Sequence, residues 1–183
     1  IGNNGGDGLA IARQLIQHGY HVIVYITNCS KKRSPDFLVN YDRIKDVTKD
    51  WPILLACKED FPEITEKDIV IDAIFGTGLN RPVTGWLAQL FTYLNSIPAF
   101  TIAIDMPSGL KANEPHQEDD AILIADHTFT FQTPKISFFL PQTGGNVGMD
   151  DDVYIGLDPE YMGKAKPIAQ LIGKEAAQNI YRS

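Results

Sequence analysis

The sequence predicts an α/β fold in which helices cover both faces of a mostly parallel sheet. Strand-like and helix-like segments alternate along the chain, and the strand-like segments are short apolar runs rich in β-branched and aromatic residues. Several of these runs lead directly into glycine-rich loops. With 183 residues and 44% hydrophobic content, the chain can bury one substantial core. None of its apolar runs is long enough to span a bilayer.

The first half of the chain contains two helical patterns and three strand-like runs. Apolar residues at helical spacing predict a helix that starts at Asp7 and stops at Gly19. Ser34-Pro35-Asp36 is a helix-start signal that follows the basic stretch Lys31-Lys32-Arg33, and helical spacing then continues to Val47. The expected strands cover residues 20–26, 53–56 and 68–75.

The second half continues the alternation. A helix is expected over residues 86–94, and strands over residues 99–105, 125–132 and 152–155. The acidic runs at 118–120 and 150–152 are interpreted as solvated loops. Because the chain opens at Ile1 inside a glycine-rich string, we expect a preceding segment with at least one strand.

Composition narrows the possible function. A net charge of −7 and a pI of about 5.0 argue against non-specific nucleic-acid binding and against an anionic membrane surface. A nucleotide ligand is still possible, because backbone amides and helix ends can hold a phosphate. Cys29 and Cys57 lack zinc or redox spacing, so we expect buried, inert thiols in a reducing cytoplasm.

The first candidate site is the string Gly2-Asn3-Asn4-Gly5-Gly6-Asp7-Gly8. Closely spaced glycines let backbone amides approach an anion, and the following helix adds a favourable dipole. Asp7 is a candidate helix cap, and Asn3 or Asn4 could offer an amide oxygen to a cation. The alternative is a tight turn without a ligand. The string is neither the usual dinucleotide fingerprint nor a Walker loop, and the next strand ends at Asn28 without an acidic residue.

Two aspartates follow apolar runs at the edge where open α/β sheets bind ligands. Asp72 precedes Gly76-Thr77-Gly78, and its carboxylate needs a cation, amide donors or a proton; it could also simply bond neighbouring backbone. Asp105 is a candidate general acid or base, with an Asx-turn into Pro107 as the alternative. Lys135 could reach an acid or phosphate in the same crevice, although a loop lysine is more often solvated.

Together, in this order, these segments resemble the NAD(P)H-hydrate epimerase family, the YjeF N-terminal domain. The matching strings are residues 2–8, 72–79, 105–109 and Thr133-Pro134-Lys135 with the later glycines, so the resemblance runs from Ile1 to about Pro159. It implies a Rossmann-like three-layer αβα sandwich that interconverts the R and S epimers of hydrated NADH or NADPH (NAD(P)HX) in metabolite repair.

The resemblance also implies site residues. The substrate contacts would be Asn3, Asn4, Gly5, Gly6, Asp7, Gly76, Thr77, Gly78, Leu79, Asn80, Arg81, Pro82 and Asp105. A potassium ion would be held by Asn4, Asp72 and Ser108. Asp105 would assist the proton transfers of the reaction, with Lys135 helping to set its ionisation.

For domain organisation, the resemblance implies an N-terminally truncated epimerase domain over residues 1–162 and a linker over 163–183. The linker would lead to a fused ATP- or ADP-dependent hydrate dehydratase. We further expect a cytoplasmic homo-oligomer with a small-molecule substrate and neither a nucleic-acid nor a membrane partner. The alternatives are a noncatalytic nucleotide- or protein-binding module on the same fold, and a kinase or other nucleotide transferase, which lacks a metal-binding acid pair near a Walker-like loop.

Overall fold

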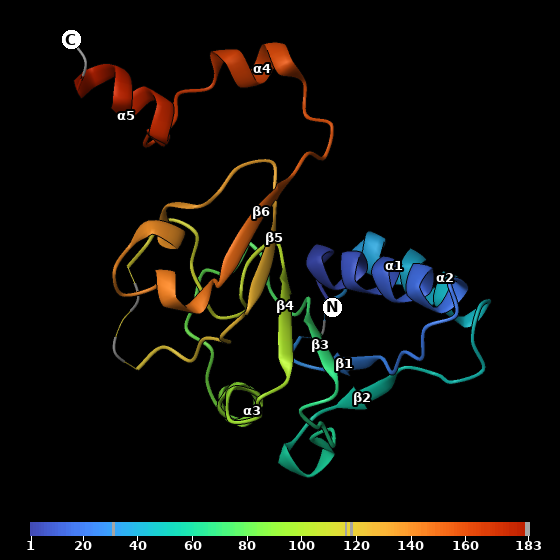
Figure 1. Cartoon of the computed structure of the whole chain (residues 1–183). Coiled ribbons are helices and arrows are strands. Elements are labelled where there is room, and N and C mark those ends of the chain that lie inside the picture. The colour runs from blue at the N-terminus through green and yellow to red at the C-terminus, as the bar shows by residue number, and fades with distance from the viewer. Residues whose placement is uncertain (31, 116, 118, 182–183) are drawn as a thin grey trace. The chain divides into compact units, whose positions relative to one another are not determined.

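The computed structural model describes residues 1–30, 32–115, 117 and 119–181 and divides the chain into two compact units, Ile1–Val153 and Tyr154–Ser183. Unit 1 alternates strands and helices (Figure 1). Its elements are α1 (Asn3–Gln17), β1 (Tyr25–Thr27), α2 (Pro35–Lys45), β2 (Ile53–Leu55), η1 (Lys58–Asp60), β3 (Ile69–Asp72), α3 (Trp86–Asn95), β4 (Phe100–Ile104), β5 (His127–Phe131), η2 (Ile136–Phe139), η3 (Gly144–Asn146) and β6 (Met149–Val153).

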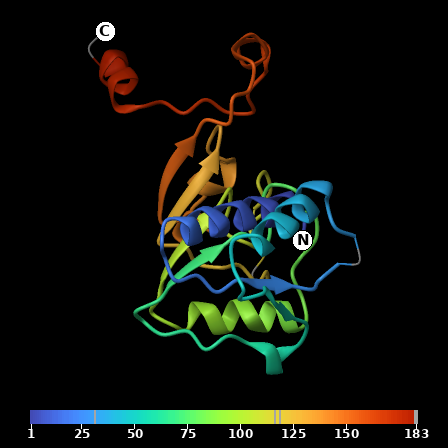
Figure 2. The ribbon, with the colours of Figure 1, turned by 90° about the vertical axis from the view of Figure 1, so that its right-hand side faces the viewer.

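Every strand pair in the described residues is parallel. β1 pairs with β2, and a separate four-stranded sheet has the order β3-β4-β5-β6. Helices α1 and α2 pack together on one side of the strands and α3 lies on the other, as both views show (Figures 1 and 2). The predicted α/β class with helices on both faces is therefore confirmed.

The core follows this layering. One apolar cluster lies between α1, α2 and β1 and includes Leu9, Ile26 and Phe37. A second packs α3 against neighbouring strands and loops, with Leu90 and Phe91 almost fully buried. A third lies under the loops after β4 and β5. Helices that pack against parallel strands in this way fix where the strand ends, and therefore the loops after them, can lie.

The strand boundaries differ from the sequence expectation at both ends of the chain. The run at 20–26 contributes only β1, because Tyr20 and its neighbours find no ladder partner in the described residues. At the other end, β6 begins at Met149 and takes in Asp150, Asp151 and Asp152, so the interpretation of 150–152 as a loop is wrong. All five β6 residues are exposed, so the strand tolerates three consecutive aspartates, a composition typical of a loop.

Helix boundaries were better predicted where a cap is present. Ser34 Oγ accepts a hydrogen bond from the Phe37 N–H at 3.2 Å and starts α2 as expected. Gly19 follows α1 with φ +85°, the left-handed geometry that favours glycine. Unit 2, taken by itself, contains the short helices α4 (Pro159–Lys164) and α5 (Lys174–Tyr181).

Two further observations concern the chain as a whole. No helix in the described residues is long and apolar enough to cross a membrane. Cys29 is half-buried and Cys57 is exposed, so the expectation of two buried thiols is wrong for Cys57. Hydrogen bonds to the carboxylates of Glu59 and Asp60 nevertheless raise the pKa of the Cys57 thiol, which keeps it in the less reactive protonated form.

Candidate active site

A cavity of about 640 Å³ lies where strands of unit 1 end, within the size range of small-molecule sites. Its walls come from the start of α1, the loops after β1 and β3, the residue after β4 and the last residue of β5. The lining residues are Ile1, Gly2, Asn3, Asn4, Asp7, Cys29, Ser30, Lys32, Ile74, Phe75, Gly76, Thr77, Gly78, Leu79, Asn80, Arg81, Asp105 and Phe131.

Most of the substrate contacts implied by the resemblance meet at this cavity. Asn3, Asn4, Asp7, Asp105 and the loop from Gly76 to Arg81 line it. Gly5, Gly6 and Pro82 do not line it. The structure therefore gathers segments that are about 100 residues apart in sequence, as in the pair Asn4 and Ile104, whose Nδ2 and carbonyl oxygen are 3.0 Å apart.

The start of α1 is a suitable anion site. The helix begins at Asn3 with Gly2 as its N-cap and without a side-chain cap, so its first backbone N–H groups are available to a ligand. Asp7 lies inside the helix, so the predicted capping role of Asp7 is wrong. Burial, followed by the neighbouring charges of Asp105 and Asp36, raises the pKa of Asp7.

The glycines of this string allow close packing. A Cβ built on Gly8 would lie 2.6 Å from the Cβ of Ala73, just beyond β3. One built on Gly6 would lie 3.1 Å from the backbone nitrogen of Phe37 in α2. Glycine at these positions therefore brings α1 against both β3 and α2, and so brings the start of α1 to the loop after β3.

Asp105 is held in an unusual backbone conformation at the cavity wall. Its φ is +68°, in the left-handed region that few non-glycine residues adopt, and only 7% of its surface is exposed. The Asp105 N–H donates to the Phe129 carbonyl oxygen at 2.8 Å. Its Oδ2 accepts the Thr77 N–H at 2.9 Å, so the carboxylate bridges the end of β4 to the loop after β3 rather than forming the alternative Asx-turn.

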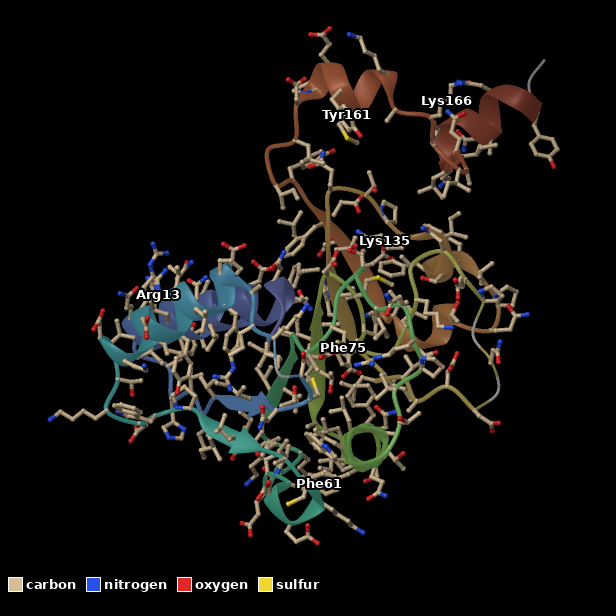
Figure 3. The ribbon with its side chains drawn as sticks, turned by 180° about the vertical axis from the view of Figure 1, so that it is seen from behind. Arg13, Phe61, Phe75, Lys135, Tyr161 and Lys166 are labelled. Atoms are coloured by element: carbon tan, nitrogen blue, oxygen red, sulfur yellow. The ribbon has the colours of Figure 1, made fainter. Side chains whose placement is uncertain are left out.

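Lys135 supports this carboxylate from behind the cavity wall. Its Nζ lies 3.4 Å from Asp105 Oδ1 and donates to Thr130 Oγ1 and to the carbonyl oxygens of Phe131 and Thr133 at 2.8–2.9 Å. Its side chain, labelled in Figure 3, is only 12% exposed by its solvent-accessible surface, so the alternative of a solvated loop lysine is wrong. Lys135 does not line the cavity and would act on a ligand through Asp105.

Asp72 and Ser108 form a buried pair beside the cavity. Ser108 donates its Oγ–H to Asp72 Oδ1 at 2.6 Å and its N–H to Oδ2 at 2.7 Å, and the Ile74 N–H donates to Oδ1 at 3.1 Å. Burial raises the pKa of Asp72 to about 6, against the lowering effect of these hydrogen bonds. Asp72 therefore does form hydrogen bonds with neighbouring backbone, which was the alternative considered from the sequence. Its charge nevertheless has no cationic partner within the described residues.

Asn4 has one amide oxygen without a partner. Its Nδ2 donates to the Ile104 carbonyl, whereas its Oδ1 is buried and accepts no hydrogen bond from the described residues. A buried oxygen of this kind is costly unless a donor or a cation fills the space beside it. No cluster of three or more His, Cys, Asp or Glu side chains suited to a metal occurs in the described part of the chain.

Several cavity residues were missed by the sequence reasoning. Ile74, Phe75 and Phe131 provide apolar wall, with Phe75 labelled in Figure 3. Cys29, Ser30 and Lys32 come from the loop after β1. The position of this loop could have predicted Cys29, Ser30 and Lys32. It follows the first strand after the glycine string, and in open α/β sheets the loops after the strands bind ligands.

The chain is similar to a known family and to several known proteins. The family model described as "YjeF-related protein N-terminus" matches residues 1–137. An NAD(P)H-hydrate epimerase of Anaerococcus prevotii is 41% identical over 119 residues, which are 62% of this chain and 53% of the relative. A bifunctional NAD(P)H-hydrate repair enzyme Nnr of Synechocystis is 30% identical over 186 residues, which are 97% of this chain and 33% of the relative.

The structural comparison supports the fold. The crystal structure of yeast ynu0 superimposes with a TM-score of 0.59 at 20% identity, covering 82% of this chain and 61% of the yeast chain. This chain thus spans about half of the Anaerococcus relative and a third of the Synechocystis one.

Proposed function

This chain belongs to the family of YjeF-related protein N-termini, and we propose that it interconverts the R and S forms of hydrated NADH and NADPH as a metabolite-repair isomerase. The names of its relatives suggest this reaction. The observation that carries the proposal is the placement of Asp105 in the same cavity as the uncapped start of α1. One end of the cavity can hold phosphate while a fixed carboxylate faces the reacting ring.

The chemistry requires inversion of a ring carbon that bears a hydroxyl and is bonded to the ring nitrogen. The C–O bond breaks as the hydroxyl takes up a proton and leaves as water, and the nitrogen lone pair forms an iminium. Water then adds to the other face and returns a proton, so that no net proton is consumed. We assign this proton transfer to Asp105, which Thr77 and Lys135 hold in position.

The test is the rate at which purified R-NADHX is epimerised in potassium buffer, followed by chromatography that resolves the epimers. We expect a rate well above the spontaneous background, and a loss of about 100-fold or to background in Asp105→Asn. Asparagine tolerates a positive φ, so this variant keeps the backbone geometry. Asp50→Asn, which changes an exposed aspartate outside the cavity, is the matched control.

Two results would contradict the assignment. A folded Asp105→Asn protein with the full rate would remove Asp105 from the mechanism. A wild-type rate equal to background, with hydrated cofactor still raising the thermal midpoint, would favour the noncatalytic binding module. The midpoint is therefore measured alongside the rate.

We also propose a potassium ion held by Asn4, Asp72 and Ser108. The unpartnered Asn4 Oδ1 and the buried Asp72 carboxylate are oxygen ligands of the kind that hard cations prefer. When bound, the ion would supply positive charge that offsets the Asp72 carboxylate.

Potassium binding can be measured without any activity assay. We expect a higher thermal midpoint in potassium chloride than in sodium chloride at equal ionic strength, and no such difference in Asn4→Ala. Asn40→Ala, on the exposed side of α2, should keep the difference. Equal wild-type midpoints in the two salts would argue against the ion.

The proposal extends to the protein around this domain. We propose that residues 1–162 form the epimerase domain and that 163–183 lead toward a fused dehydratase, since the Synechocystis relative is named as bifunctional. The mass of the native protein tests this. We also propose a cytoplasmic location, which suits the two free thiols, and a homo-oligomer, for which light scattering after size-exclusion chromatography gives the number of copies.

A further inference from the structure

The cavity extends beyond the residues that the proposed reaction uses. Asp105 and the loop from Gly76 to Arg81 line part of it. Cys29, Ser30 and Lys32 also line it, from the loop that joins β1 to α2. The uncapped start of α1 lies among the lining residues as well. A ligand that filled the whole cavity would therefore contact loops after three different strands.

Sheet topology indicates how a dinucleotide would lie across these loops. In open parallel sheets the pyrophosphate sits at the start of the helix after the glycine-rich string, and a ribose lies near the end of the next strand in the chain. Here that helix is α1 and the next strand is β1. With the nicotinamide half at Asp105, the adenosine ribose falls at Ser30 and Lys32.

The residues in the loop between β1 and α2 are better suited to bind a phosphate than a free ribose hydroxyl. Dehydrogenases that select a free 2′-hydroxyl place a carboxylate after this strand, and a basic residue there accommodates a 2′-phosphate. The described residues between β1 and α2 include no Asp or Glu. The cavity's own carboxylates, Asp7 and Asp105, come from α1 and from the end of β4.

Local geometry leaves the basic and hydroxyl groups of this loop available. Ser30 Oγ accepts the Lys32 N–H at 3.2 Å, which fixes the turn while the serine hydroxyl proton can still be donated. Lys32 is exposed, and its ammonium forms no ion pair with any residue that the structure describes. The hydroxyl proton of Ser30 and the ammonium of Lys32 can therefore be donated to an anion without breaking a contact that the structure describes.

We propose that Ser30 and Lys32 form a subsite for a phosphate monoester on the adenosine ribose, so that the protein prefers NADPHX to NADHX. The choice of hydrated substrates rests on the proposed function. The subsite itself recognises only the adenosine half, and its existence can be tested separately from the reaction.

The first experiment compares adenosine 2′,5′-bisphosphate with adenosine 5′-monophosphate by calorimetric titration of the full chain. We expect the bisphosphate to bind about tenfold more tightly, the effect of one charge-assisted contact. Lys32→Ala should bring the two affinities close together, and Ser30→Ala should narrow the gap partly. Lys49→Ala, which removes an exposed lysine outside the cavity, is the matched control and should keep the tenfold ratio.

Three outcomes would overturn the subsite. The first is equal binding of both nucleotides by the wild-type protein, and the second is a Lys32→Ala variant that retains the full ratio. The third is loss of the ratio in Arg81→Ala and not in Lys32→Ala, which would place the phosphate at the loop after β3. Circular dichroism of each variant confirms that the change in ratio is not a loss of folding.

A second experiment separates this inference from the proposed function. The ratio of kcat/KM for NADPHX to that for NADHX should fall in Lys32→Ala. If neither hydrate is epimerised but the bisphosphate preference depends on Lys32, the proposed reaction fails and the subsite stands. If both hydrates are epimerised with equal kcat/KM in wild type and variant, the reaction stands and the subsite fails.

Discussion

Asp72 and Asp105 come at the ends of neighbouring strands, yet their carboxylates meet different surroundings. Asp105 faces a cavity and is bound by a lysine and a backbone amide. Asp72 is buried, and among the described residues it receives hydrogen bonds from Ser108 and Ile74. The first arrangement positions a charge for a ligand, whereas the second makes ionisation of a buried group costly for the folded state.

The buried Asp72 carboxyl has a consequence for stability. Its pKa is 3.8 when exposed and about 6 in the folded protein, so the folded state binds this proton more tightly than the unfolded state does. Well below pH 3.8 both states hold the proton and no cost arises. Between that pH and about 6 the unfolded carboxyl ionises before the folded one, so stability falls, and once pH has risen through 6 the loss levels off at about 3 kcal/mol.

Urea unfolding in potassium-free buffer measures this effect. Because other carboxylates also titrate, the useful quantity is the unfolding free energy of Asp72→Asn minus that of wild type. We expect the difference to shift in favour of the variant between pH 4 and pH 8, whatever its offset from altered hydrogen bonds to Ser108. A difference that is constant across this range would show that Asp72 does not titrate as described.

Single-residue roles could be predicted only where the chain marks them locally. Asp72 and Asp105 end apolar runs before turn residues, so their place at the ligand edge follows from the sequence. Lys135 carries no such mark, so the sequence offered its contact with an acid only as one alternative, and the resemblance alone assigned it to Asp105. Its ion pair depends on a turn in which Gln132 adopts φ +69°, and no sequence signal specifies that for glutamine.

At the scale of elements, helices with a strong start signal were predicted almost to the residue. Ser34 and Pro35 define α2, and the apolar spacing of Trp86–Asn95 defines α3. The start of α1 was misplaced by four residues, because glycines disfavour a helix interior in isolation. In this protein the close contacts with Ala73 and Phe37 require glycine. The same contacts stabilise the helical conformation through packing, and helix propensity alone does not include packing.

The sequence predicted where strands occur, but it did not predict how long each strand is. Apolar content marks residues 20–26 and 68–75, yet ladder partners decide how much of each run forms a strand. β6 is the opposite case. Its three consecutive aspartates disfavour a strand, and the parallel register with β5 from His127 to Phe131 overrides that preference.

For the whole molecule, alternation of elements was enough to predict the fold class, since few arrangements bury both helices and short apolar strands. The meeting of the glycine-rich start of α1 with the loops after β3 and β4 at one cavity followed from that class. The division into β1–β2 and β3–β6 could not be predicted, because pairing between strands depends on contacts far apart in sequence. The size of the cavity and its extension to Lys32 likewise depend on packing.

The outer strand β6 bears on how copies of this protein meet. In the described residues β6 pairs only with β5, which leaves its other edge open to a strand from another molecule. Asp150 and Asp152 are exposed along this strand, while Asp151 pairs with His127. Two such edges brought together would place like charges side by side, so the aspartates oppose sheet extension between molecules.

We therefore expect the double variant Asp150→Asn/Asp152→Asn to keep its fold but to associate as its concentration rises, with a growing light-scattering signal at neutral pH. Asp158→Asn, in unit 2, serves as a control with the same type of charge loss. If the double variant stays as dispersed as wild type, some other feature protects the edge. On this view the acidic strand serves the protein's colloidal stability, whatever the cavity binds.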